Sequence, residues 1–107
     1  MINLNDLAKQ SHSLTEQRGL DADVISSLKH CAGEVVEATE AYYIWTDLTA
    51  TEEVNAKHKS DFALELADII ICALTASADM SIDIEKAINE AMMKNARRAY
   101  AKGNKTI

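Results

Sequence analysis

Residues 61–79, which read DFALELADIIICALTASAD, decide the fold class of this chain. The three consecutive isoleucines at 69–71, taken alone, favour a β-strand, because β-branched side chains fit a pleated backbone. The flanking segments ALELAD and ALTASAD, however, consist mostly of residues with high helix propensity. We therefore predict one continuous helix from about residue 61 to residue 79.

The composition of the whole chain extends this prediction to an all-α fold. The 107 residues include no proline and only three glycines, so the chain is poor in the residues that form sharp turns. This length suits one domain, residues 1–107, with one hydrophobic core. Aromatic residues make up only 5% of the chain, so we expect a core of Leu, Ile, Val, Ala and Met between closely packed helices.

Three further helices are predicted from capping residues and from apolar residues spaced three and four apart. The first runs from Asn5 and Asp6 to Gly19, the second from a cap at Asp21 or Asp23 to about Leu48, and the fourth from a cap at Ser81 or Asp83 to Gly103. Residues 49–61 are polar and rich in capping residues, so we predict a loop there. The expected fold is a four-helix bundle with long second and third helices.

The charge and hydropathy of the chain argue against two classes of partner. Seventeen acidic residues against eleven Lys and Arg give a formal net charge of −6, whereas nucleic-acid polymers are bound by an excess of basic side chains. The longest apolar run, IIICAL at 69–74, is far shorter than the roughly 20 residues that span a bilayer. The N-terminus MINLNDLAKQ lacks the apolar region of a signal peptide. We expect a cytoplasmic protein that binds neither nucleic-acid polymers nor membranes.

The two cysteines, Cys31 and Cys72, do not form a Cys-x-x-Cys motif. Small secreted domains usually carry more cysteines, joined in disulfides. We therefore predict two free, buried thiols.

Two pairs of carboxylates interrupt the apolar stretches of the second and third predicted helices. Glu34 and Glu37 are three residues apart, as are Glu65 and Asp68, so the members of each pair lie on the same side of a helix. A carboxylate in a buried helix is costly unless it is paired or binds a metal. If the two pairs face each other, four oxygen donors converge, as in the carboxylate sites of helix bundles.

Such a donor set favours hard cations such as Mg²⁺, Mn²⁺ or Ca²⁺. Di-iron bundles add a Glu-x-x-His motif, and none of His12, His30 and His58 follows a glutamate by three residues. The alternative is that these acids lie on the solvated face of amphipathic helices, where Glu-x-x-Glu pairs are common.

The end of the fourth predicted helix is basic. Residues 94–105, KNARRAYAKGNK, contain five of the eleven basic side chains. The helix dipole alone favours cations at a C-terminus. The functional interpretation is phosphate binding beside a metal, with Arg98 as a bidentate donor and Lys94 as a point charge. Trp45 is a candidate for stacking on a base, with core or subunit contacts as the alternative.

Together these residues resemble the MazG-like, all-α nucleoside triphosphate pyrophosphohydrolases. In that family Glu-Glu-x-x-Glu is followed, after a loop, by Glu-x-x-Asp, and GEVVE (33–37) and ELAD (65–68) occupy those places here. The segment ADMSIDIEKAI (78–88) looks like the family's junction of third and fourth helices, and NARRAYAKGNK (95–105) is similar to its tail motif, Asn-x-x-Arg-x-Tyr-x-x-Gly-x-Lys. The resemblance covers nearly the whole chain.

The resemblance implies a magnesium-dependent enzyme that cleaves a (d)NTP to a (d)NMP and pyrophosphate, as a house-cleaning activity on the nucleotide pool. The implied metal-binding and catalytic residues are Glu34, Glu37, Glu65 and Asp68, with Mn²⁺ as a substitute for Mg²⁺; the candidate substrate contacts are Lys94, Asn95, Arg98, Lys105 and Trp45. The resemblance also implies a homo-oligomer, a dimer or a tetramer, which would cover the apolar faces expected on the long helices.

Two positions depart from the family pattern. Gly33 stands where the family has its first glutamate, and Ala91 stands where a lysine is often found. Both departures favour an alternative, a catalytically weak relative that binds nucleotides or a protein partner. A third interpretation is a purely structural helical oligomer with its acids on the surface. Turnover assays separate the first two interpretations, and magnesium titration separates both from the third.

Overall fold

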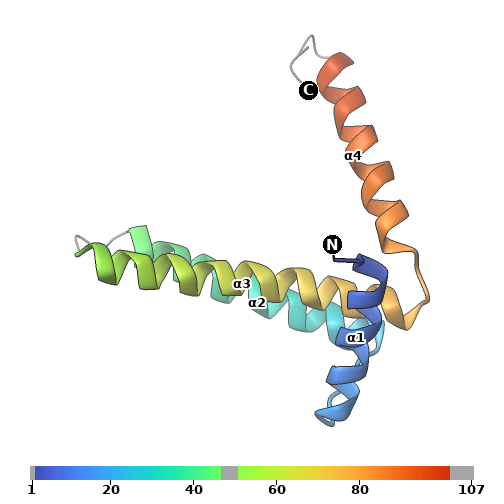
Figure 1. The fold of residues 1–107 in the computed structure, drawn as a ribbon, viewed down its shortest axis with the longest axis horizontal. Helices are drawn as coiled ribbons and strands as arrows, with labels where there is room; N and C mark the ends of the chain where they lie inside the picture. The colour runs from blue at the N-terminus through green and yellow to red at the C-terminus, as the bar shows by residue number, and fades with distance from the viewer. Residues whose placement is uncertain (1, 47–50, 102–107) are drawn as a thin grey trace.

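The computed structural model describes residues 2–46 and 51–101, and these form four α-helices without a strand in either range (Figure 1). The helices are α1 (Leu4–Gln17), α2 (Val24–Thr46), α3 (Glu52–Asp79) and α4 (Ile84–Ala101). The predicted all-α class is therefore confirmed. Among the described residues, no helix is both long and apolar enough to cross a bilayer.

The helices α2 and α3 form a long antiparallel hairpin, α1 packs across α3 at one end of it, and α4 leaves the hairpin (Figure 1). The radius of gyration is 17.1 Å, whereas a compact domain of this length has about 13 Å. The difference arises because α2 and α3 are long and α4 packs only lightly, mainly against α1. A single chain is thus an open arrangement of four helices.

The end of the α2–α3 hairpin nearest α1 is held by polar contacts centred on Asp79. One oxygen of Asp79 lies 3.1 Å from Nε2 of His12 on α1, and the other accepts a hydrogen bond of 3.1 Å from the backbone N–H of Val24. Nearby, the buried hydroxyls of Ser11 and Thr75 lie 2.6 Å apart. These contacts fix α1 against the start of α2 and the end of α3.

The start of α1 differs from the prediction, because the N-cap is Asn3 and not Asn5. The side chain of Asn3 accepts a hydrogen bond of 3.1 Å from the backbone N–H of Asp6. The helix ends as predicted: Gly19 follows its C-cap with φ of +76°, a conformation that costs glycine little.

The start of α3 also differs, because residues 52–61 are helical and the predicted loop at these positions is wrong. The Thr51 side chain caps the helix by accepting from the backbone N–H of Val54, and two glutamates in the first turn suit the helix dipole. Aromatic side chains then hold this part of α3 against α2. The ring centroid of Phe62 lies 5.6 Å from that of Tyr42 and 6.0 Å from that of Trp45. The predicted helix ends at Leu48 and Gly103 lie outside the described residues.

The buried core of the described chain is small. Its hydrophobic members are four alanines and one leucine: Ala8, Ala22, Ala38, Ala76 and Leu74. Of the expected core of Leu, Ile, Val, Ala and Met, only Ala and Leu are therefore buried among the described residues, because the hairpin is covered by α1 at one end only. Many large apolar side chains on α2, α3 and α4 are exposed, including Ile70 at 57% and Met92 at 63%.

The side chain of Asn5 joins α1 to the start of α4. Its Oδ1 accepts a hydrogen bond from the backbone N–H of Ile84 (2.9 Å), and its Nδ2 donates to Oδ1 of Asp83 (2.9 Å). The backbone N–H of Leu4 also donates to Glu85. This joint is the main attachment of α4 to the rest of the chain.

We predict that acid weakens this joint. The hydrogen bond from Asn5 is the main cause that lowers the pKa of Asp83, followed by the backbone N–H of Lys86. A lowered pKa means that the ionised form stabilises the fold above the unfolded value of about 3.9, and that this contribution is lost as pH falls through the folded pKa. In thermal unfolding between about pH 5 and pH 2, Asn5→Ala should lose less stability than the wild type. If the stability of the wild type and of Asn5→Ala fell equally steeply with pH, the effect of Asn5 on Asp83 would be contradicted.

Candidate metal centre

The antiparallel pairing of α2 and α3 brings acidic side chains from both helices together. Each of Glu34, Glu37 and Glu65 offers one carboxylate oxygen, and these oxygens lie within 4.8 Å of one another. Glu34 and Glu37 share a side of α2 because they are three residues apart, and Glu65 faces them from α3. We call these three residues the carboxylate cluster.

Two members of the cluster have buried oxygen atoms without partners. Oε2 of Glu34 and Oε2 of Glu65 are buried and accept no hydrogen bond from any described residue. The Glu34 side chain is only 12% exposed, and its Oε1 lies 2.9 Å from Nε2 of the more exposed His30. Glu37 is exposed. Buried carboxylate oxygens without a donor are unfavourable unless a proton or a cation compensates them.

The electrostatic environment of Glu65 reflects this crowding of like charges. Burial is the main cause that raises the pKa of Glu65, followed by a hydrogen bond that only its protonated form can make to Glu34 and by the charges of Glu37, Glu34 and Asp68. The shift means that burial, and then the neighbouring carboxylates, disfavour the ionised form of Glu65. A bound cation would relieve this repulsion, and all-oxygen donors of this kind fit Mg²⁺ or Mn²⁺. Exposed acidic side chains also cluster in proteins that bind no ion. The arrangement therefore identifies possible metal ligands and does not show that a metal is bound.

Of the four predicted metal ligands, Asp68 lies at the edge of the carboxylate cluster and not within it. It is exposed and does not belong to the carboxylate cluster, although its charge acts on Glu65. It lines a cavity of about 520 Å³ beside the cluster, together with Glu34. The sequence did not predict this cavity, because its walls come from three helices that are distant in the chain.

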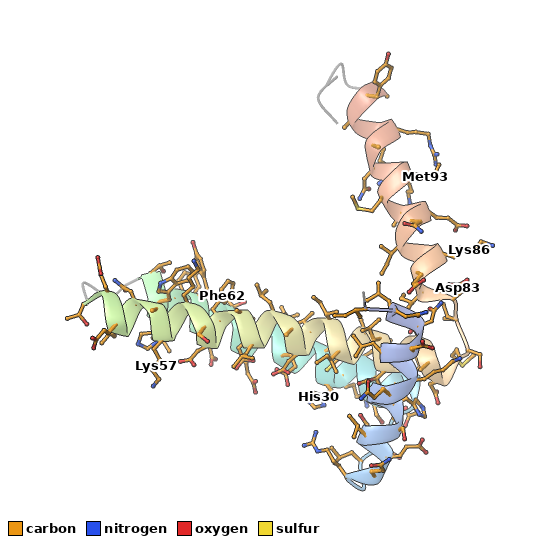
Figure 2. The ribbon with its side chains drawn as sticks, viewed as in Figure 1. His30, Lys57, Phe62, Asp83, Lys86 and Met93 are labelled. Atoms are coloured by element: carbon orange, nitrogen blue, oxygen red, sulfur yellow. The ribbon has the colours of Figure 1, made fainter. Side chains whose placement is uncertain are left out.

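The predicted substrate contacts do not reach the carboxylate cluster within one chain. Lys94, Asn95 and Arg98 lie on α4, and Figure 2 shows Met93 about midway along that helix, well away from His30 on α2. Trp45 is eleven residues beyond Glu34 on α2, about 16 Å along the axis, and its ring packs on Phe62. Lys105 lies outside the described residues.

Sequence reasoning overlooked His30 as a neighbour of the cluster. Its ring nitrogen lies within hydrogen-bond distance of Glu34, four residues later on the same helix. The signal was present, since residues four apart on a helix are neighbours. The Glu-x-x-His motif of di-iron bundles does not include His30, because His30 precedes Glu34 by four residues.

The two cysteines flank the carboxylate cluster and are free, as predicted, but only partly buried. Burial is the main cause that raises the pKa of the Cys72 thiol to about 11, and Cys31, Glu34 and Asp68 act in the same direction.

We therefore predict slow alkylation of Cys72. Relative to an ordinary thiol, a shift to about 11 lowers the thiolate fraction at pH 8 about 100-fold, and the thiolate is the nucleophile. In the wild type, iodoacetamide should alkylate Cys72 roughly 100-fold more slowly in native than in denatured protein, measured by mass spectrometry of the peptide that contains Cys72. Equal rates would show that the thiol is not held in this environment.

The fold and this site define an all-α protein with a cluster of partly buried carboxylates between two antiparallel helices. Comparison of the chain with protein-family models, with curated proteins and with solved structures gave no match.

Proposed function

We propose that this protein is a magnesium-dependent nucleoside triphosphate pyrophosphohydrolase of the MazG-like type, which converts a (d)NTP to a (d)NMP and pyrophosphate. The observation that carries the proposal is the approach of Glu34, Glu37 and Glu65 across the hairpin, with two buried carboxylate oxygens that have no partner among the described residues. A nucleotide-pool house-cleaning role in the cytoplasm is part of the proposal.

The residues of the cluster have separable tasks in this reaction. Glu34, Glu37 and Glu65 hold the cation, and the contact with His30 orients Glu34. Bound Mg²⁺ supplies Lewis-acid stabilisation of the negative charge on the phosphates. Asp68, exposed at the edge of the neighbouring cavity, is placed to accept the proton of an attacking water. The water oxygen bonds to phosphorus as the bond between phosphorus and the α–β bridging oxygen breaks, which leaves the monophosphate and pyrophosphate.

The phosphate contacts require a second copy of the chain in this proposal. Lys94, Asn95 and Arg98 lie on α4, which projects away from its own hairpin with exposed apolar residues (Figure 1). A dimer or tetramer that completes the helical bundle would cover these apolar faces and bring basic side chains to the acids of another copy.

The alternative function is a catalytically weak oligomer that binds nucleotides or a protein partner. The separation of α4 from the cluster within one chain favours it, together with Gly33 and Ala91. In that case the protein would bind a nucleotide without releasing pyrophosphate.

The test is pyrophosphate release from a panel of ribo- and deoxyribonucleoside triphosphates, with Mg²⁺, with Mn²⁺ and with a chelator. We expect release that depends on the metal and differs among nucleotides. Calorimetric titration of Mg²⁺ without nucleotide measures the ion separately. Metal binding without turnover would favour the alternative, and the absence of both would leave only a structural oligomer.

A further inference from the structure

The cavity beside the carboxylate cluster has the size and lining of a binding site for a small organic group. Its volume of about 520 Å³ lies within the range of ligand pockets. Thr15 and Arg18 line it from the end of α1, and Glu34 and Asp68 line it beside the cluster. Its remaining walls combine apolar side chains such as Ile71 with hydroxyl groups. A ligand there would meet an apolar surface, hydrogen-bonding groups and carboxylates in one place.

One hydroxyl in the wall of this cavity differs from the other helical hydroxyls. Several serine and threonine side chains donate to a backbone carbonyl one turn earlier in their own helix: Thr15, Thr39, Thr46, Thr75 and Ser77. Ser27 is only 5% exposed, and its Oγ has no hydrogen-bond partner among the described residues.

An acceptor for the Ser27 hydroxyl is available on its own helix. The carbonyl of Asp23, four residues earlier, accepts the backbone N–H of Ser27 at 2.9 Å and has a second lone pair. Serine commonly uses that carbonyl when it has no other partner. A buried hydroxyl without any partner destabilises the fold. A ligand in the cavity is one source of the missing partner.

We propose that Ser27 is a specificity-determining residue of this cavity, where its hydroxyl hydrogen-bonds to the nucleoside part of a nucleotide whose phosphates face the cation held by the carboxylate cluster. The proposal rests on the proposed function for the identity of the ligand. A nucleobase has a flat apolar face and polar edges, which matches the mixed lining. The Oγ is covered by neighbouring atoms, and rotation about χ1 to another staggered position would turn it toward the cavity.

The first experiment measures binding of nucleosides without phosphates or metal, so it does not depend on catalysis. Thymidine, deoxycytidine, deoxyadenosine and deoxyguanosine are titrated into wild type, Ser27→Ala and Ser77→Ala, with NMR shifts as the readout. Ser77 is the matched control, because it is equally buried but donates to Leu74 and does not line the cavity. We expect Ser27→Ala to weaken the tightest nucleoside about fivefold and to reduce the differences among the four, while Ser77→Ala binds as wild type does.

The second experiment compares the stabilities of the same variants without ligand. Ser27→Ala removes an unpartnered hydroxyl, so its melting temperature should equal or exceed that of the wild type. Ser77→Ala removes a bonded hydroxyl and should melt lower. A clear loss of stability in Ser27→Ala would show that its hydroxyl has an internal partner and would overturn the proposal.

The outcomes separate this proposal from the proposed function. Nucleoside binding that depends on Ser27, without pyrophosphate release by the wild type, would support the cavity assignment and reject the enzyme. Pyrophosphate release with the same KM values in Ser27→Ala and wild type would support the enzyme and reject the role of Ser27. No nucleoside binding at millimolar concentration, or equal binding by Ser27→Ala, would also overturn it.

Discussion

Replacing Glu65 with glutamine should lower pyrophosphate release at least about 100-fold, the loss typical when one preorganised electrostatic contact is removed. Glutamine keeps the shape of the side chain but removes the negative charge that the cluster contributes from α3. Asp68→Asn should also be folded and inactive, because its carboxylate is assigned the proton transfer. Circular dichroism checks the fold of both variants, and phosphate-coupled assays measure the rates.

Without metal, the same Glu65→Gln variant should be more stable than the wild type at neutral pH. The pKa of Glu65 is raised in the folded protein, mainly by burial and then by Glu34. A raised carboxyl pKa means that the folded state holds its proton more tightly, so stability falls as pH rises above the unfolded value of about 4.3. Glutamine cannot ionise and avoids this loss. Thermal unfolding in the presence of a chelator measures whether the variant is more stable than the wild type. Added Mg²⁺ should then stabilise the wild type more than the variant.

The matched control for both measurements is Glu53→Gln, an exposed glutamate in the first turn of the same helix and outside the cluster. It should keep the activity and the magnesium response of the wild type. Full activity in Glu65→Gln would remove the carboxylate cluster as the site of hydrolysis. A loss of activity in Glu53→Gln of the same size would show that the effect is not specific to the cluster.

If the protein assembles as proposed, replacing Ile70 with lysine should convert it to monomers. Leu66 and Ile70 are one turn apart on α3 and are 45% and 57% exposed in the single chain. Leu66 also lines an apolar hollow of about 290 Å³ on the hairpin, together with Val35 and Tyr43. If a second copy covers this face, an unpaired charge there costs about 3 kcal/mol or more. The dissociation constant then rises by over about 100-fold.

Analytical ultracentrifugation over a range of concentrations measures this change. The control is Lys57→Gln on the outer part of the hairpin, where Lys57 is already exposed (Figure 2). This variant should assemble as the wild type does. A wild type that remains monomeric, or an Ile70→Lys variant that assembles normally, would contradict the proposed role of this face. Loss of activity together with loss of assembly would further support phosphate contacts from a second copy.

The helices were predictable where their determinants are local. The end of α1 at Gly19 follows from the backbone conformation that glycine adopts, and the end of α3 at Asp79 was placed correctly. The start of α3 was not predictable from apolar periodicity, because residues 52–61 are mostly polar. The cap at Thr51 and the two glutamates of the first turn, which stabilise this start, are local signals that the prediction of a loop passed over.

The carboxylate cluster was predictable in part. The spacing of Glu34 and Glu37 placed them on one side of α2, and the apolar surroundings of Glu65 marked it as unusual. The exposed position of Asp68 was not evident, since it depends on how α3 is rotated against α2. The unpartnered hydroxyl of Ser27 was not evident either, because the sequence does not show which hydrogen bonds a side chain makes in the fold.

The sequence by itself determined that this chain is helical, where α1 and α3 end, and which carboxylates share a helix face. These properties depend on propensity, capping and spacing over a few residues, so they survive without knowledge of the fold. Only the tertiary structure decided that the acids of α2 and α3 face each other beside a cavity, and that α4 leaves the hairpin through the joint at Asn5. Those properties depend on contacts between residues far apart in the chain, such as Asn5 with Ile84.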